Sequence, residues 1–200
     1  MIENIVESLL KDNHWRTDIE EQFVCIKSIK GSCLNPSIPV VHIRLDLGQH
    51  VAPGLVLDTV NDPEVRMRWE TNYKSMQIVK KYSGWQFVSA VVIKIAVPMI
   101  KNREFVEHKI VKQQGNCTKV IYYSIELDEA PITSAAERGE TLLGMQMIVK
   151  EERSTVVHII TQTDLKLSLF NALQGLAVSK LKDWAYMLKK QFEIQPQQLE

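Results

Sequence analysis

The chain has 200 residues, of which 45% are apolar and 24% charged, as is ordinary for a globular protein. This length suits a single domain over residues 1–200 with a sizeable core. Lys and Arg balance Asp and Glu at 24 each, so the net basic excess typical of nucleic-acid-binding proteins is missing. We therefore expect no nucleic acid among the partners.

The cysteines and the N-terminal residues indicate a cytoplasmic protein. Three cysteines occur without any CxxC pair, at Cys25, Cys33 and Cys117. This spacing favours reduced thiols over disulfides or a zinc site. The sequence starts without a basic segment followed by an apolar one, and the longest apolar run, 88–100, is interrupted by polar residues and Pro98. We expect contact with membranes only at their surface.

The first half of the chain is predicted to contain two helical regions separated by short strands. Residues 1–22 are expected to be helical, because Ile2, Ile5, Val6 and Leu9 form one apolar stripe, although Asp12-Asn13 interrupts it. Strands are predicted at 23–26 and 38–43, with turn residues between them. Residues 51–70 look helical in two pieces, since Asp62-Pro63 is a good N-cap and first-turn pair.

The second half is predicted to be strand-rich and to end in a long helix. Strands are expected at 74–81, 85–97, 104–113, 117–127, 141–150 and 154–163, with short turns between them. This pattern favours an antiparallel sheet. Apolar residues then recur at helical spacing from Leu169 to Phe192, which predicts a helix of about 25 residues. The order of elements fits an α+β helix-grip fold, in which a curved sheet wraps the C-terminal helix.

Sequence motifs of known chemistry are missing. There is no G-x-S-x-G, HExxH, P-loop or G-x-G-x-x-G, and the five histidines lack metal-ligand spacing. His42 and His158 are better explained as hydrogen-bonded structural residues. Glu107 and Glu126 could in principle form an acid/base pair, but solvated or ion-paired carboxylates explain them better. These observations disfavour an enzyme, and we expect no metal and no cofactor.

Several segments match, in order and spacing, the motifs of one family. Residues 61–70 (NDPEVRMRWE) are similar to D-x-x-x-R-x-x-W-D, and residues 98–106 (PMIKNREFV) to P-x-x-x-x-R-D-F-V. Tyr123-Ser124-Ile125, Pro131, Arg138 and the Q-x-D of residues 162–164 follow at the expected places. Over about residues 40–193 the chain thus resembles the START domain, the steroidogenic acute regulatory protein-related lipid-transfer family. Glu70 and Glu104 replace aspartates, and the Gly-x-x-Pro turn usual after Asp164 is missing.

The resemblance implies a helix-grip fold that encloses an apolar tunnel, with one lipid inside and no chemistry or cofactor. The ligand would be a phospholipid, a sterol or a fatty-acid-like molecule. A lipid chain exposed to water costs about 0.8 kcal/mol per CH₂, so a protein interior can compete with a bilayer for it. The protein would transfer this lipid between membranes, and we expect it to be a monomer.

The resemblance also suggests which residues line the tunnel. In similar START proteins an internal basic residue lies six positions after the loop arginine, which places it at Lys109. From the sequence alone Lys109 could equally be an exposed strand lysine. Gln113 stands where the phosphatidylcholine carrier has an aspartate that pairs with this basic residue, so that pair is not kept. Strand alternation adds further candidates for ligand contact, some of which ordinary core packing would also explain: Tyr122, Ser124, Ala90, Val92, Lys94, Met145, Met147, Phe170, Leu173, Ala177 and Leu181.

Because Ala90 and Val92 stand where relatives have acidic or amide groups, we expect an apolar wall on that side and no ceramide-like head group. Pro98, Met99 and Ile100 fall at the loop that lies beside the tunnel mouth in this family. An apolar tip next to cationic residues suits shallow insertion into a membrane, although packing on the last helix is the alternative. Arg103 with Glu104 is expected to form a structural ion pair.

Two other functions stay open at this point. One is an enzyme of the wider helix-grip superfamily, such as a cyclase or a hydrolase-like protein, that uses the same cavity. It would need converging acid and base groups, for which only Lys109 and Tyr122 can be named. The other is a regulatory module that senses a lipid and signals to a partner.

Overall fold

The computed structural model describes residues 1–193 apart from 96, 98, 131–134 and 168–169, and only the backbone of residues 170–177. Its elements are α1 (Ile2–Leu10), β1 (Arg16–Glu20), β2 (Val24–Ile29), β3 (Val40–Asp46), α2 (Pro53–Asn61), α3 (Pro63–Trp69), β4 (Tyr73–Ser83), β5 (Gln86–Ile93), β6 (Asn102–Gln114), β7 (Cys117–Ser124), β8 (Ala136–Arg138), β9 (Glu140–Lys150), β10 (Thr155–Asp164) and α4 (Phe170–Lys190).

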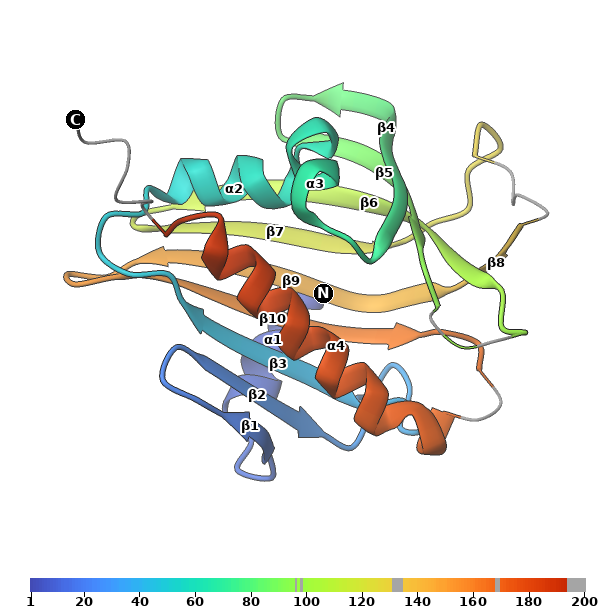
Figure 1. Ribbon diagram of the computed structural model, residues 1–200, viewed down its shortest axis with the longest axis horizontal. Helices are drawn as coiled ribbons and strands as arrows, with labels where there is room; N and C mark the ends of the chain where they lie inside the picture. Colours follow the sequence, from blue (N-terminus) through green and yellow to red (C-terminus); the bar gives the residue numbers. More distant parts are fainter. Residues whose placement is uncertain (96, 98, 131–134, 168–169, 194–200) are drawn as a thin grey trace.

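The strands form one open sheet in the order β1-β2-β3-β10-β9-β7-β6-β5-β4 (Figure 1). All neighbours along this path are antiparallel, while the short β8 pairs with β6 in parallel. Strands β1 and β4 are the two edges, and the register of β4 against β5 shifts at three places. The large antiparallel sheet and the long C-terminal helix confirm the predicted helix-grip fold class.

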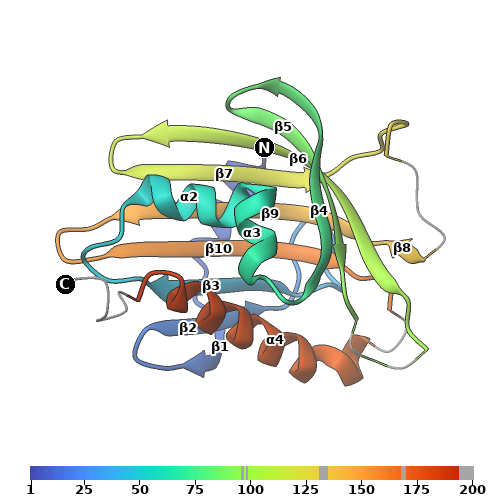
Figure 2. The ribbon, with the colours of Figure 1, turned by 45° about the horizontal axis from the view of Figure 1, so that its top comes forward.

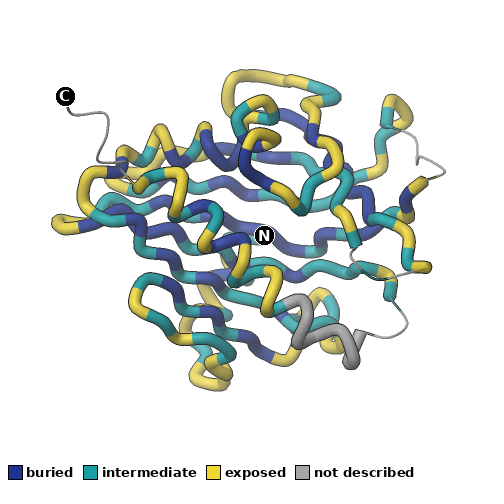
Figure 3. Tube along the Cα trace, viewed as in Figure 1, coloured by how far each residue is buried: buried dark blue, intermediate teal, exposed yellow. Residues whose placement is uncertain are grey.

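Helices α2, α3 and α4 cover one face of the sheet, and α1 covers the opposite face (Figures 1 and 2). We call these the inner face and the outer face. On the inner face Trp184 and Leu188 of α4 pack with Ile43 of β3 and Ile148 of β9. On the outer face Val6 of α1 packs with a separate apolar cluster. Figure 3 shows that buried residues recur along the central strands, which the two helical layers enclose.

The helical and strand boundaries differ from the predictions mainly near the N-terminus. Helix α1 ends at Leu10, and residues 16–20, predicted as helix, form β1 instead. The apolar stripe does not extend past Leu10, and residues 16–20 instead pair with β2 as an edge strand of the sheet. The strand predicted at 85–97 ends at Ile93, and the three-residue β8 was not predicted.

The junction of α2 and α3 follows the local sequence signal. The Asp62 carboxylate accepts hydrogen bonds from the backbone N–H groups of Glu64 and Val65, at 2.8 and 3.1 Å. Pro63 occupies the first helical turn, where its missing N–H costs nothing. This cap fixes the start of α3 and therefore the direction in which Arg66 and Trp69 point.

Side-chain contacts anchor the C-terminal half of α4 near the β1 edge of the sheet. Lys182 and Tyr186 both donate hydrogen bonds to the Glu21 carboxylate in the β1–β2 turn. The Tyr186 ring packs edge-on against Phe23, and the Lys189 ammonium donates to the Asp46 carbonyl at 3.1 Å. These contacts hold α4 across β2 and β3.

Two histidines form a pair on the outer face. His42 Nε2 and His158 Nδ1 share a hydrogen bond of 3.0 Å, and Trp15, which follows α1, packs edge-on against His42. Burial, helped by His158, Lys27 and Arg44, lowers the pKa of His42 to about 4. The pKa of His158 is also lowered, again mainly by burial. Both were expected to be hydrogen-bonded structural histidines, and the structure confirms this.

This pair predicts acid sensitivity of folding. Because the pKa of His42 is lower in the folded protein than in the unfolded chain, the unfolded state binds more protons below about pH 6.5. The free energy of unfolding should therefore fall as the pH drops from 6.5 towards 4, with up to about 3 kcal/mol from this site. Urea unfolding of wild type and His42→Gln at several pH values measures the effect. The free energy of unfolding of the variant should fall less steeply as the pH drops. Parallel pH profiles for the two proteins would contradict the prediction.

Candidate functional site

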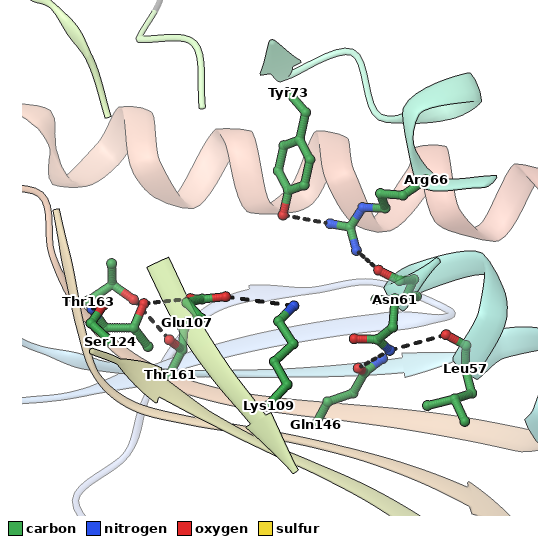
Figure 4. Close-up of polar contacts among 12 residues, drawn as sticks. Leu57, Asn61, Arg66, Tyr73, Glu107, Lys109, Ser124, Gln146, Thr161 and Thr163 are labelled. Carbon is green, nitrogen blue, oxygen red and sulfur yellow. Dashed lines mark hydrogen bonds and ion pairs between the residues drawn. The ribbon is translucent and has the colours of Figure 1, made fainter. Parts of the chain in front are cut away.

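The register of the central strands brings polar residues together on the inner face. Residues directly opposite each other in neighbouring strands point to the same side of a sheet. One such row contains Ser89, Glu107 and Ser124 of β5, β6 and β7. The next contains Phe87, Lys109, Tyr122, Gly144 and Thr161, from β5 through β10. A third row contains Val120 and Gln146. The helices α2 and α3 lie above these rows (Figure 4).

Arg66 is the central residue of the helical side of the site. Its guanidinium donates to the Val60 carbonyl at 2.8 Å, to Glu70 at 3.2 Å and to the Tyr73 hydroxyl at 3.1 Å. The aromatic rings of Trp69, Tyr73 and Trp184 surround it, at 4.8, 4.7 and 5.7 Å from the guanidinium carbon to the ring centres. Cation–π contacts of this kind strengthen when water is excluded. The guanidinium therefore has partners in or next to α2, α3, β4 and α4.

Glu107 and Lys109 form the charged pair on the sheet side. The Lys109 ammonium lies 3.7 Å from one Glu107 oxygen and 5.6 Å from the centre of the Tyr122 ring. The other Glu107 oxygen accepts a hydrogen bond of 2.8 Å from the Thr141 hydroxyl. The Thr141 N–H in turn donates to the Ser124 hydroxyl at 2.8 Å. Figure 4 shows this chain running along the inner face, opposite Arg66.

Burial shifts the protonation of these groups. It lowers the pKa of Lys109, because the charged ammonium loses water, while the Glu107 charge opposes the shift. Burial likewise raises the pKa of the Tyr73 and Tyr122 hydroxyls, which therefore stay neutral. The site thus combines two ion pairs, Arg66–Glu70 and Lys109–Glu107, with neutral hydroxyl groups.

Some buried polar atoms of the site lack a hydrogen-bond partner within the described part of the chain. Asn61 donates to the Gln146 side-chain oxygen at 3.2 Å, but Gln146 Nε2 has no partner. The same holds for Ser89 Oγ and for Arg66 Nε. Gln146 is 3% exposed and Ser89 is fully buried. Buried polar groups without partners are rare in proteins, so these atoms are candidates for hydrogen bonds to a ligand or to water.

The structure supports part of the predicted inward-facing set. Lys109, Tyr122 and Ser124 all lie on the inner face, and Lys109 is buried rather than exposed. Leu181 of α4 packs against the inner apolar cluster. The side chains of Phe170, Leu173 and Ala177 and the whole of Pro98 lie outside the described residues. Whether the inward residues contact a ligand stays a prediction.

The predicted inward orientation is wrong for three residues at β5. Lys109 pairs with Phe87, so the odd-numbered residues of β5 face inward and Ala90 and Val92 face outward. Ala90 belongs to an outer cluster with Val88 and Val106. Lys94 follows the end of β5 and is exposed, with its ammonium donating to the Thr71 carbonyl. The predicted apolar wall of Ala90 and Val92 is therefore on the outer face, and Phe87, Ser89 and Val91 take the inward places.

Met145 and Met147 also lie on the outer face, contrary to prediction. Both pack with the cluster beneath α1, which includes Val6 and Ile160. Their neighbours Gly144 and Gln146 face inward instead, since they oppose Tyr122 and Val120 of β7. A shift of one residue in an assumed register moves every side chain to the other face.

Arg103 and Glu104 form structural ion pairs, but not with each other as predicted. Adjacent strand residues point to opposite faces, so they cannot meet. Their partners come from β8, where Glu137 and Arg138 lie opposite in parallel register. The Arg103–Glu137 distance is 3.0 Å and the Glu104–Arg138 distance is 3.1 Å.

Sequence reasoning missed Glu107, Gln146 and Asn61 as members of the site. Glu107 was recognisable, because residues two apart on a strand share a face and Lys109 was already a candidate. Arg66 was recognised as part of a motif without being assigned to the site. Asn61 and Gln146 carried no local signal, since the contact joins α2 to β9, 85 positions apart in sequence.

Within the described residues, no group of three or more His, Cys, Asp or Glu side chains could hold a metal ion. Among the helices of the same part of the chain, none is long and apolar enough to cross a membrane.

Comparison with known proteins identifies the family. The family model of the START domain matches residues 3–180. The chain belongs to the START domain family. This confirms the resemblance drawn from the motifs and extends it to the N-terminal residues. No curated protein matches the sequence of this START domain significantly.

Solved structures of START proteins share its fold at low sequence identity. Human StAR-related lipid transfer protein 5 has a TM-score of 0.82 and 19% identity, with 95% of this chain and 93% of that chain covered. Human STARD10 has a TM-score of 0.78 and 16% identity, covering 94% and 78%. A STAR-related lipid transfer protein from Xanthomonas axonopodis has a TM-score of 0.71 and 12% identity, covering 91% and 100%.

The contact of Tyr122 with Gly144 gives a test of the site geometry. A Cβ atom at Gly144 would overlap with the Tyr122 ring, so Gly144→Ala should push the ring off its place beside Lys109. Overpacking of this kind costs about 1–3 kcal/mol, which urea unfolding would measure. Gly84→Ala is the matched control, because nothing lies within 4 Å of its Cβ position. Equal stability of the two variants would contradict the described position of Tyr122.

Proposed function

We propose that this START domain binds one lipid between the inner face of its sheet and α3 and α4, and carries it between membranes without changing it chemically. The observation that carries the proposal is the buried polar cluster around Glu107 and Lys109, which lies beneath helices and contains atoms without partners among the described residues. A lipid whose polar group lies at this cluster would complete those hydrogen bonds.

The side chains next to the polar cluster are apolar, as the surroundings of a lipid tail must be. Phe87, Val111 and Val120 pack against Leu57 at one end of the inner face. A larger apolar cluster, with Trp184 and Leu188 of α4, extends over β2 and β3. Such surroundings replace the bilayer interior for a hydrocarbon chain, at about 0.8 kcal/mol per CH₂ removed from water. In this proposal Lys109, Tyr122 and Ser124 contact the ligand, and the enclosing tunnel lies between the sheet and α4.

Lipid analysis of the purified protein tests the proposal directly. Native mass spectrometry should show a bound species that corresponds to one lipid per protein chain, and organic extraction should identify it. Addition of vesicles made from a total lipid extract should load any empty protein to the same ratio. A protein that stays empty under both conditions, or that converts a small substrate, would contradict a carrier function.

The proposed route of exchange is the loop between β5 and β6. Met99 is completely exposed at 103% and is followed by Ile100 and the exposed Lys101. An apolar tip beside a cation suits shallow insertion between lipid head groups. In the cell we propose a cytoplasmic protein that touches membranes transiently through this loop.

Acidic substitutions in the loop test this membrane contact. Met99→Asp with Ile100→Asp should slow vesicle-to-vesicle transfer about tenfold while leaving thermal stability unchanged, because the charges oppose insertion. Trp85→Asp is the matched control, since Trp85 is 60% exposed in the β4–β5 turn, at the opposite end of β5. Unchanged transfer by the loop variant, or equal slowing by both, would contradict a specific role of this loop.

A further inference from the structure

We infer that the lipid bound at this site carries an uncharged head with a hydroxyl group, rather than a phosphate or carboxylate. The inference rests on the proposed function and specifies its ligand. It starts from the charges of the site and the partners that each of them already has.

The sheet-side charges neutralise each other. Lys109 has its counter-ion, Glu107, on the same strand, at 3.7 Å. Both side chains are about nine-tenths buried, so water screens them little. Thr141 occupies the second Glu107 oxygen, which fixes the carboxylate towards the ammonium. At 3.7 Å the ion pair leaves the N–H donors of Lys109 open to a ligand oxygen, and an anionic oxygen there would lie beside the negative charge of Glu107.

The helix-side cation also has its counter-ion, Glu70, although its Nε has no partner among the described residues. Arg66 has a carboxylate, a carbonyl and a hydroxyl as hydrogen-bond acceptors and three aromatic rings around it. The Glu70 carboxylate is 1% exposed and also accepts from the Asn72 N–H. The four charges of the site, Arg66, Lys109, Glu70 and Glu107, therefore sum to zero. An added phosphate or carboxylate would leave a buried negative charge without a counter-ion, which is strongly unfavourable.

The unpartnered atoms of the site are two N–H donors, Gln146 Nε2 and Arg66 Nε, and one hydroxyl, Ser89 Oγ. Ser89 Oγ lies on a fully buried side chain directly opposite Glu107, and Gln146 Nε2 is a neutral donor on a buried side chain. A ligand hydroxyl can donate to the Glu107 carboxylate and accept from the Ser89 hydroxyl in the same place. A carboxylate or phosphate only accepts, so Glu107 would repel it. The geometry of Ser89 and Glu107 thus suits a group that both donates and accepts one hydrogen bond.

Two ligands that differ only in the head test the inference. Oleyl alcohol and oleate have the same chain, and a carboxyl group in water is ionised at about pH 7. Wild-type protein should bind the alcohol at least about tenfold more tightly, measured by displacement of a fluorescent fatty alcohol. Equal or tighter binding of oleate, or of phosphatidylcholine from vesicles, would overturn the inference and leave the carrier function intact. Failure of all three to bind would overturn the proposed function, and the inference with it.

A charge variant shows whether Glu107 sets the preference. Glu107→Gln keeps an acceptor for Thr141 but leaves Lys109 without a counter-ion, so the ratio of oleate to alcohol affinity should rise at least about tenfold. Adding Lys109→Met should abolish this rise, because the freed cation is then gone. Glu126→Gln is the matched control, since Glu126 is exposed beyond β7. An unchanged ratio in Glu107→Gln, or a rise that survives Lys109→Met, would overturn the assignment.

Discussion

The buried guanidinium of Arg66 is the interaction on which the arrangement of the helices depends. It joins the end of α2, through the Val60 carbonyl, to Glu70 after α3 and Tyr73 in β4, while Trp184 brings in α4. A charge this deeply buried is stable only when all of these partners are in place. Loss of one partner would leave the others around an uncompensated charge, so the four elements are held to one relative position.

Because of this constraint, the candidate site has a helical side and a sheet side. Arg66 and Glu70 hold the helical layer, while Glu107 and Lys109 belong to the sheet, and each pair is neutral by itself. Because neither pair needs the other, α3 and β6 can face each other without a salt bridge between these two pairs. Neutral groups, such as Asn61 with Gln146, make the direct polar connection between the layers. The charges at the place proposed for the ligand are therefore balanced, and the neutral groups Ser89 and Gln146 lie beside them with unpartnered atoms.

The sequence predicted the fold better than the faces of the strands. The apolar periodicity of α4 and the Asp62-Pro63 cap are local signals, and both elements lie where expected. The identity of β1 depends on pairing with β2, which no local pattern reveals. The orientation of Ala90 and Met145 depends on which residue of one strand lies opposite which residue of the next. One wrongly assumed register put several residues on the wrong face of the sheet. Lys109, Tyr122 and Ser124 were nevertheless placed on the correct face.

The free edge at β4 has a consequence for how the protein behaves at high concentration. An exposed edge strand offers unpaired backbone groups to any passing chain, which is a common start of aggregation. Here the register shifts at three points along β4, and the exposed Lys74 and Lys81 place positive charge along it. Bulges bend the edge and charges repel a second copy, so β4 is a poor template for further strands. The sheet can thus stay open and curved, ending at a strand that discourages its own extension.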